Sequence, residues 1–243
     1  MEIYFDEAGR GPLAWPLYIG LVISKLSHKE LKTFPLFRDS KKLSEHQREA
    51  AFEQIETLIS EGKLVTCTAS VEAEFIDEYG VTKAIFFAIC KGLYQLFHTL
   101  LESKAKRKGS LEDLKLLFQT REIEHHEKIL LVLDGKSDFW LWKALEIMTK
   151  TVVHGDDRLA EISIASLLAK VGRDHEMYEL AKSYPQYSFE HHKGYGTKAH
   201  YESIKKLNSM VSALFIENSF SKNTFLIGKS KNGKRFRFSP PNI

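Results

Sequence analysis

Residues 129–135 read ILLVLDG, the most apolar strand-like run in the chain. A short apolar run that stops at Asp-Gly is typical of a buried strand in the centre of a sheet. Runs rich in apolar or β-branched residues predict further strands at 2–5, 17–23 and 63–69. We therefore expect several short strands, with the one ending at Asp134 buried in the centre of the sheet.

Helical patterns separate these strands. Ser44 stands three residues before Gln47, which is the spacing of a capping box and predicts the start of a helix. Apolar residues at helical spacing predict long helices from 83 to about 103, from 157 to 182 and from 197 to 207. Strands that alternate with helices predict an α/β fold.

Two segments fall outside this alternation. Residues 104–127 are charged and lack strand-like alternation, so we expect a surface insertion there. From 208 onward Ser, Asn, Gly and Pro become more frequent, and Lys222 to the C-terminus holds six basic residues and no acid. We therefore expect a main domain at 1–207 and a small helical or tail-like appendage at 208–243. Its basic residues alternate with aromatic ones, which suits auxiliary duplex binding, although a plain basic tail is equally consistent.

Composition narrows the class of protein. The chain has 243 residues, 43% of them hydrophobic and 28% charged, which is typical of a folded globular protein. A net charge of +3 does not by itself establish a nucleic-acid partner. No apolar run approaches the roughly 20 residues that cross a bilayer, and the N-terminus lacks the pattern of a secretory signal. Cys67 and Cys90 lack metal or redox spacing, so we expect a cytoplasmic protein with no membrane contact.

Carboxylates stand where strands are expected to end. Asp6 and Glu7 follow the first strand, and Asp134 ends the most apolar one. The ends of strands in open α/β sheets are the usual place for a site. Asp174 lies on the polar stripe of the 157–182 helix. Taken singly, each acid also fits a turn former or a helix cap, and Asp174 can pair with Lys170 one turn away.

Several acids gathered at one sheet edge would repel each other unless a divalent cation neutralised them. Oxygen ligands without a Cys/His cluster of zinc spacing favour Mg²⁺ or Mn²⁺. Two such ions are the general device for in-line phosphodiester cleavage. Adjacent histidines, as at 125–126 and 191–192, point apart on regular structure, so we do not expect them to chelate a metal.

Five motifs occur in order along the chain. They are DEAGRGPLA at 6–14, DSKKLSE at 39–45, LDG at 133–135, ISIASLLAKVGRD at 162–174 and YPQYSFEHHKGYGTKAHYESIKKL at 184–207. In wording and order they resemble the ribonuclease HII family over roughly 2–100 and 129–207. The resemblance implies a ribonuclease H-like fold, a central mixed sheet flanked by helices, with the C-terminal appendage added to it.

Carried over residue by residue, the resemblance implies both metal-binding and substrate-binding positions. The metal-binding and catalytic acids fall on Asp6, Glu7, Asp134 and Asp174. The substrate-binding residues fall on Gly9, Arg10, Gly11, Ser40, Lys41, Lys42 and Tyr195. The glycine-rich backbone is expected to read the 2′-hydroxyl at an RNA–DNA junction, because only glycine lets main-chain atoms approach a sugar closely. The tyrosine is expected to pack on the neighbouring deoxyribose, and the lysines to face phosphates.

The resemblance also implies the reaction. We expect a two-metal endoribonuclease, using Mn²⁺ or Mg²⁺, that hydrolyses the RNA strand of RNA–DNA hybrids. We also expect it to nick duplex DNA on the 5′ side of single embedded ribonucleotides, leaving 3′-hydroxyl and 5′-phosphate ends, and to act as a monomer. The related type HIII carries a Gly-Lys version of the first motif and an extra N-terminal domain, so the Gly-Arg-Gly at 9–11 favours type HII.

The chain departs from the family pattern at three places. Trp15 stands where a small residue is usual, Tyr79-Gly80 replaces an Asn-containing turn, and Ile216-Glu217 replaces a basic pair. The last departure removes positive charge, which weakens the inference near residues 212–220.

Two other functions are compatible with parts of the sequence. A non-catalytic nucleic-acid binder would use the lysines and the basic tail, but four acids would repel phosphates unless a metal were present. A glycosidase with a carboxylate pair would work in the presence of a chelator and would place aromatic residues near Asp6 and Asp134. Trp15 is the one candidate for that role, so both alternatives explain less than a nuclease does.

Overall fold

The computed structural model describes residues 1–14, 16–37, 42–100, 129–145, 147–215, 225–229 and 235–238. For residue 142 and from 208 onward it describes the backbone alone. The expected insertion at 104–127, together with Trp15, Ser40 and Lys41, therefore lies outside the described residues.

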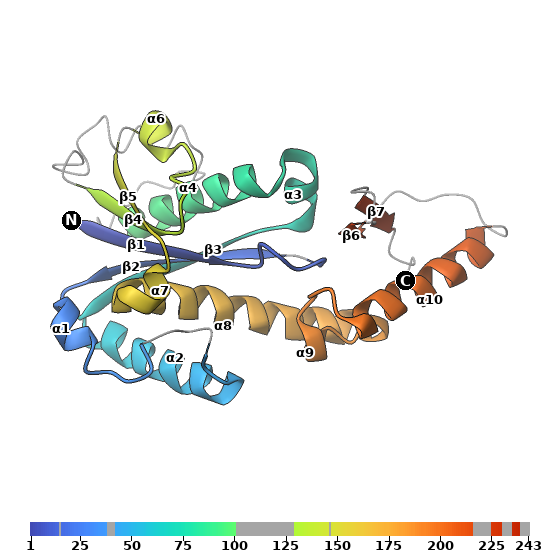
Figure 1. The fold of residues 1–243 in the computed structure, drawn as a ribbon, viewed down its shortest axis with the longest axis horizontal. Helices are drawn as coiled ribbons and strands as arrows, with labels where there is room; N and C mark the ends of the chain where they lie inside the picture. Colours follow the sequence, from blue (N-terminus) through green and yellow to red (C-terminus); the bar gives the residue numbers. More distant parts are fainter. Residues whose placement is uncertain are drawn as a thin grey trace.

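The centre of the fold is a mixed five-stranded sheet with the order β3-β2-β1-β4-β5 (Figure 1). The strands are β1 (Glu2–Ala8), β2 (Leu17–Ser24), β3 (Leu64–Val71), β4 (Leu130–Asp134) and β5 (Met148–Val152). β1 pairs antiparallel with β2 and β2 with β3, whereas β4 pairs parallel with both β1 and β5. The prediction of an α/β fold with a central mixed sheet is confirmed.

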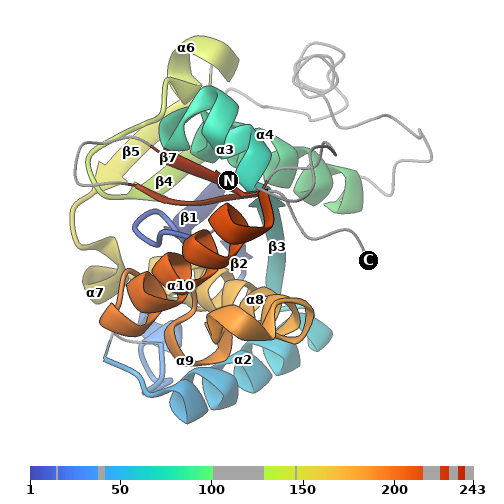
Figure 2. The same cartoon turned by 90° about the vertical axis from the view of Figure 1, so that its right-hand side faces the viewer.

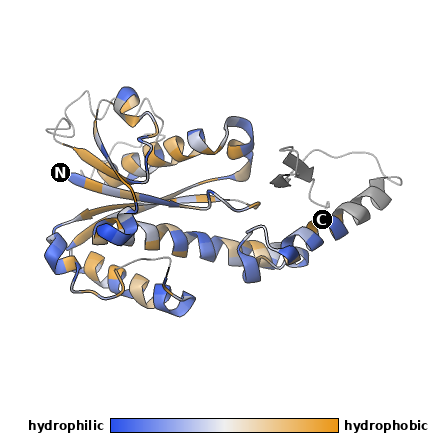
Figure 3. Ribbon diagram, in the orientation of Figure 1, coloured by the Kyte–Doolittle hydropathy of each residue, from blue (hydrophilic) through white to orange (hydrophobic). Residues whose placement is uncertain are grey.

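Helices cover both faces of this sheet. They are α1 (His28–Leu31), α2 (Glu45–Ser60), α3 (Ala73–Tyr79), α4 (Val81–Leu100), α6 (Leu141–Leu145), α7 (Gly155–Arg158), α8 (Ala160–Ser183), α9 (Phe189–His192) and α10 (Lys198–Phe215). In Figures 1 and 2, α3 and α4 lie over one face and α2 and α8 over the other. Figure 3 shows hydrophobic residues on α4, which covers one face of the sheet, and on α2, which covers the other. Within the described ranges, no helix combines the length and apolarity needed to span a bilayer.

Most element boundaries follow the sequence, with informative exceptions. Ser44 does form a capping box with Gln47 at the start of α2. β1 continues through Asp6 and Glu7 to Ala8, beyond the expected end at residue 5, because β2 supplies pairing partners up to Tyr18. The predicted helix at 157–182 begins later, since the extended backbone of Leu159 separates α7 from α8.

Two described elements bear on the expected appendage. α10 runs through the boundary expected after 207 and ends at Phe215. Beyond it, β6 (Phe225–Lys229) and β7 (Arg235–Phe238) pair antiparallel as a hairpin. The division into a main domain and an appendage stays a prediction.

The contact between α8 and the sheet depends on a glycine. A Cβ atom on Gly20 would lie 2.1 Å from the carbonyl oxygen of Ala165, much closer than any real Cβ contact. The backbone of α8 therefore rests directly on β2, and the small side chains of Ala165 and Ala169 leave room for it. This close approach places the polar residues of α8 against the end of β1.

We expect Gly20→Ala to lower the free energy of unfolding by about 3 kcal/mol or more, because helix or strand must move to admit the methyl group. Urea denaturation followed by circular dichroism measures this. Gly11→Ala is the matched control, since nothing lies within 4 Å of its Cβ position. An equal effect at both glycines would contradict the close approach.

Candidate active site

Asp6 and Asp134 meet at the same edge of the sheet. β1 and β4 run parallel with Phe5 opposite Leu133, so the next residue on each strand is one of these aspartates. Asp6 is buried, and its Oδ1 accepts a hydrogen bond from the backbone N–H of Glu7 at 2.8 Å. The hydroxyl of Ser166, on α8, donates a second hydrogen bond to the Asp6 carboxylate. This environment holds Asp6 in place from both strand and helix.

The carboxylates at this edge repel one another. Burial, followed by the carboxylates of Glu7 and Asp134, raises the pKa of Asp6 to about 7, and the hydrogen bonds from Ser166 and Glu7 offset only part of that. Glu7 is mostly buried and faces the exposed Arg10 guanidinium at 3.5 Å. The three acids therefore form an electrostatically strained group that a bound cation would relieve.

Asp134 is anchored by the turn that follows β5. The backbone N–H of Gly155 donates to Asp134 Oδ1 at 2.6 Å. A Cβ on Gly155 would lie 2.5 Å from Ile162 Cδ1 and 3.1 Å from Asp134 Oδ1. Glycine is therefore needed where the turn passes between α8 and the aspartate.

Asp156 follows immediately and was not predicted from sequence. It is 1% exposed, and both of its carboxylate oxygens are buried. β5 lies parallel to β4 with Val152 opposite Asp134, so the segment after β5 arrives at the same sheet edge. The signal was present, since an Asp-Asp pair at 156–157 follows a strand, but the strand itself had not been recognised.

The structure does not bring Asp174 to the other three acids. It lies eight residues beyond Ser166 on α8, which is about 12 Å along the helix axis. Its Oδ2 faces Nη2 of Arg48 at 3.3 Å, and Nη1 of Arg48 donates to the carbonyl of Leu43 at 2.9 Å. Burial raises the pKa of Asp174, while Arg48, Lys193 and Arg173 act in the opposite direction. This geometry gives Asp174 the role of fastening the start of α2, next to the predicted phosphate-contacting segment, and does not support its assignment to the acid group.

The donors at the edge suit a hard divalent cation, because they are all carboxylate oxygens and carry like charges. In the part of the chain that the structure describes, no three Asp, Glu, His or Cys side chains already enclose a metal position. Donor chemistry and the raised pKa of Asp6 are the features that favour a metal at this edge. His192 belongs to the adjacent histidines at 191–192, which we do not expect to chelate a metal. Both of its ring nitrogens contact the backbone, Nε2 with Tyr187 O and Nδ1 with Gly194 N–H.

The structure places two predicted substrate-binding segments side by side. One is the loop after β1, which begins at Gly9, and the other is the turn that holds Gly194 and Tyr195; together they are the substrate loops. The backbone N–H groups of Leu13 and Ala14 both donate to the carbonyl of Gly194, at 2.9 and 3.2 Å. Tyr195 follows Gly194 directly and is half exposed. Gly9 has a φ of +96°, and a Cβ there would lie 2.6 Å from Pro16 O. The Gly9–Gly11 turn and the tyrosine thus belong to one local unit, while Lys42 lies at the exposed entry to α2.

A comparison with known families assigns this architecture. The family model described as Ribonuclease HII matches residues 3–225. The chain belongs to the ribonuclease HII family. It is a ribonuclease H, a hydrolytic nuclease that acts on RNA–DNA hybrids and depends on divalent metal.

Individual relatives agree with this assignment. Ribonuclease HII of Endomicrobium trichonymphae is 37% identical over 201 residues, which cover 83% of this chain and 77% of that protein. Ribonuclease HII of Sulfurovum sp. is 36% identical over 201 residues, with 83% and 82% covered. The fold matches ribonuclease HII of Archaeoglobus fulgidus, solved in complex with PCNA, with a TM-score of 0.58, 20% identity and 87% and 88% coverage. It also matches ribonuclease H2 of Pyrococcus horikoshii OT3, with a TM-score of 0.55, 21% identity and 90% of each chain covered.

Replacing Asp6 should stabilise this ribonuclease HII when no metal is present. The pKa of Asp6 is higher in the folded than in the unfolded chain, so its contribution to stability is complete below about pH 4 and is lost as pH rises through about 7. Asp6→Asn removes this loss, and at pH 8 with chelator we expect a gain on the order of 3 kcal/mol, or about 6–12 °C in Tm.

The same Tm measurements should then be repeated with Mg²⁺ or Mn²⁺. The metal should raise the Tm of the wild type more than that of Asp6→Asn. A variant that is less stable than wild type at pH 8 without metal would refute the predicted repulsion.

Substitutions can distinguish the role of Asp156 from the role of Asp174. We expect Asp156→Asn to lower cleavage by at least about 100-fold and to weaken the metal-induced rise in Tm, because the residue lies beside the anchor of Asp134. Asp157→Asn, the exposed neighbour, is the matched control. Asp174→Asn should retain the metal response and chiefly raise KM. Loss of the metal response in Asp174→Asn, with Asp156→Asn unaffected, would restore Asp174 to the acid group.

Proposed function

We propose that this ribonuclease HII nicks duplex DNA on the 5′ side of single embedded ribonucleotides, besides cleaving the RNA strand of hybrids. We further propose that the products carry 3′-hydroxyl and 5′-phosphate ends. The observation that carries the proposal is the joined pair of loops, in which Gly194 accepts hydrogen bonds from Leu13 and Ala14. A glycine turn and a half-exposed tyrosine on one unit suit recognition of a single sugar and its neighbour.

In this proposal the acids at the sheet edge hold the metal. Asp6, Glu7 and Asp134 are the ligands inferred from sequence, and the position and burial of Asp156 add it as the fourth in place of Asp174. A bound pair of Mg²⁺ or Mn²⁺ ions would supply an activated water and would stabilise the departing 3′ oxygen. Ser166 and the backbone N–H of Glu7 keep the Asp6 carboxylate oriented at the edge.

The substrate side of the site is assigned to other groups of the chain. Main-chain atoms of Gly9, Arg10 and Gly11 approach the 2′-hydroxyl, and the ring of Tyr195 packs on the next deoxyribose. The side chain of Arg10 is 56% exposed and is therefore available to a phosphate. The segment Ser40–Lys42 is assigned further phosphate contacts, and the Asp174–Arg48–Leu43 contacts hold the residue that follows Lys42.

The proposal also includes the oligomeric state and the cellular location. We propose a monomer that acts in the cytoplasm on RNA–DNA hybrids and on ribonucleotide-containing duplex DNA. A binding protein without catalysis is the competing function, since the same acids could bind metal without cleavage.

The test uses an end-labelled DNA duplex with one ribonucleotide, incubated with Mg²⁺, with Mn²⁺ and with chelator. We expect one metal-dependent nick on the 5′ side of the ribonucleotide, which an all-DNA duplex should not show. Asp134→Asn should lower the rate at least about 100-fold, because it removes a ligand charge.

The ends are identified by mobility beside marker strands and by ligation of the nicked product. Cleavage of a long hybrid without a nick at the single ribonucleotide would contradict junction reading. Metal-dependent binding of both substrates without cleavage would favour the binding protein.

A further inference from the structure

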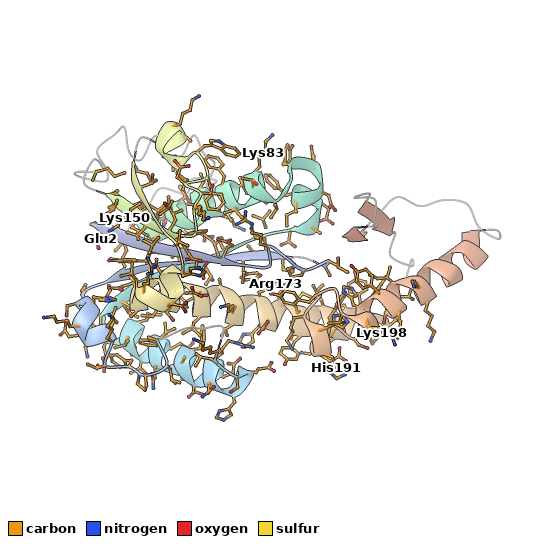
Figure 4. All side chains as sticks on the ribbon, in the orientation of Figure 1. Glu2, Lys83, Lys150, Arg173, His191 and Lys198 are labelled. Atoms are coloured by element: carbon orange, nitrogen blue, oxygen red, sulfur yellow. The ribbon has the colours of Figure 1, made fainter. Side chains whose placement is uncertain are left out.

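Arg173 has the largest of the fully buried side chains among the described residues, and it is charged. It projects from α8 into the space between the loop after β1 and the turn before α10 (Figure 4). Burying a guanidinium is unfavourable unless several acceptors compensate for the water that it loses. The identity of those acceptors is therefore informative.

Arg173 donates hydrogen bonds to three backbone carbonyls, and these come from both substrate loops. Nε donates to Pro16 O at 3.1 Å, and Nη2 donates to Ala14 O at 3.1 Å and to Lys193 O at 2.8 Å. The guanidinium carbon also lies 5.5 Å from the centre of the Tyr195 ring. One planar group thus joins the loop that follows Gly9–Gly11 to the turn that carries Tyr195.

Two glycines make room for this arrangement. A Cβ on Gly9 would lie 2.7 Å from Arg173 Nε, and one on Gly194 would lie 2.8 Å from Ala14 O. Both residues have positive φ, +96° and +78°, so both loops turn sharply at the point where they meet the arginine. Gly9 therefore lets the first loop pack against the guanidinium, and Gly194 lets the second turn pack against the first loop.

The same helix also contacts the acid group. Ser166 precedes Arg173 by seven residues, which is two helical turns, so both project from one face of α8 about 10 Å apart along its axis. Ser166 binds Asp6, and Arg173 binds the substrate loops. A rigid helix consequently sets the spacing between the acids and the groups assigned to reading the sugar.

We propose that Arg173 is a positioning residue that determines which phosphodiester is cut relative to an RNA–DNA junction. It does so by holding the glycine turn and Tyr195 as one unit at a set distance from Asp6. The proposal rests on the proposed function, because it needs those two elements to read the junction. Lysine cannot replace the arginine, since an ammonium group lacks the planar fork that reaches three carbonyls.

The experiment uses a strand of four ribonucleotides followed by DNA, annealed to complementary DNA. The quantity measured is the ratio of cleavage at the junction ribonucleotide to cleavage within the RNA, taken from one gel lane. This ratio does not depend on how much of the enzyme is folded. We expect Arg173→Lys to lower it about tenfold, since a misplacement of 1 Å can cost about 100-fold in rate.

Two further variants serve as an independent test and as a control. Gly194→Ala separates the same loops without changing the arginine, and it should lower the ratio in the same direction even if Arg173→Lys does not fold. Leu96→Ala removes a buried side chain from α4, remote from both loops, and should lower Tm while leaving the ratio unchanged.

The outcomes are distinct. A lowered ratio in the loop variants but not in Leu96→Ala supports the positioning role. An unchanged ratio in folded Arg173→Lys and Gly194→Ala overturns it, while the proposed function stands. A wild type that cuts the hybrid without preference for the junction overturns the proposed function and this proposal together.

Discussion

The absence of a side chain at Gly20 lets the backbone of α8 rest on β2, and the rest of the site follows from that contact. A helix held at ordinary distance from a sheet packs through side chains on both sides. Here Ala165 meets bare strand backbone, which brings the next residue, Ser166, to Asp6 on the neighbouring strand. The same depth allows Ile162 to press against Gly155 and so to fix the turn that holds Asp134.

The acid edge and the arginine are opposite solutions to burying charge. At the edge, like charges are gathered and the pKa of Asp6 is raised, so the folded chain is prepared for a cation. At Arg173 the positive charge is hydrogen-bonded to three neutral carbonyls, and Asp174 lies near enough to act on it as an opposite charge. The first arrangement favours exchange with solvent ions, and the second favours rigidity.

The sequence predicted the fold class and three acids that the structure brings to one edge of the sheet. An apolar strand ending in Asp134 and a strand followed by Asp6 and Glu7 were evident because local patterns specify them. β5 was missed since MTKTV has little apolar character, and it owes its place to pairing with β4, which is a nonlocal interaction. Asp156 was missed with it. The polar stripe predicted for the 157–182 helix indicated the face on which Asp174 lies, but a stripe does not show how far along the helix a contact occurs.

The two turns of α8 between Ser166 and Arg173 fix the distance between the acid edge and the substrate loops. Most side chains along this stretch are buried, so exchanges that conserve volume are tolerated best. An inserted or deleted residue is different, because it would rotate one end against the other by about 100° and shift it by about 1.5 Å. The acid edge and the sugar-reading loops would then face different directions although each remained locally intact. Evolution of this enzyme can therefore alter the composition of this part of α8 far more freely than its length.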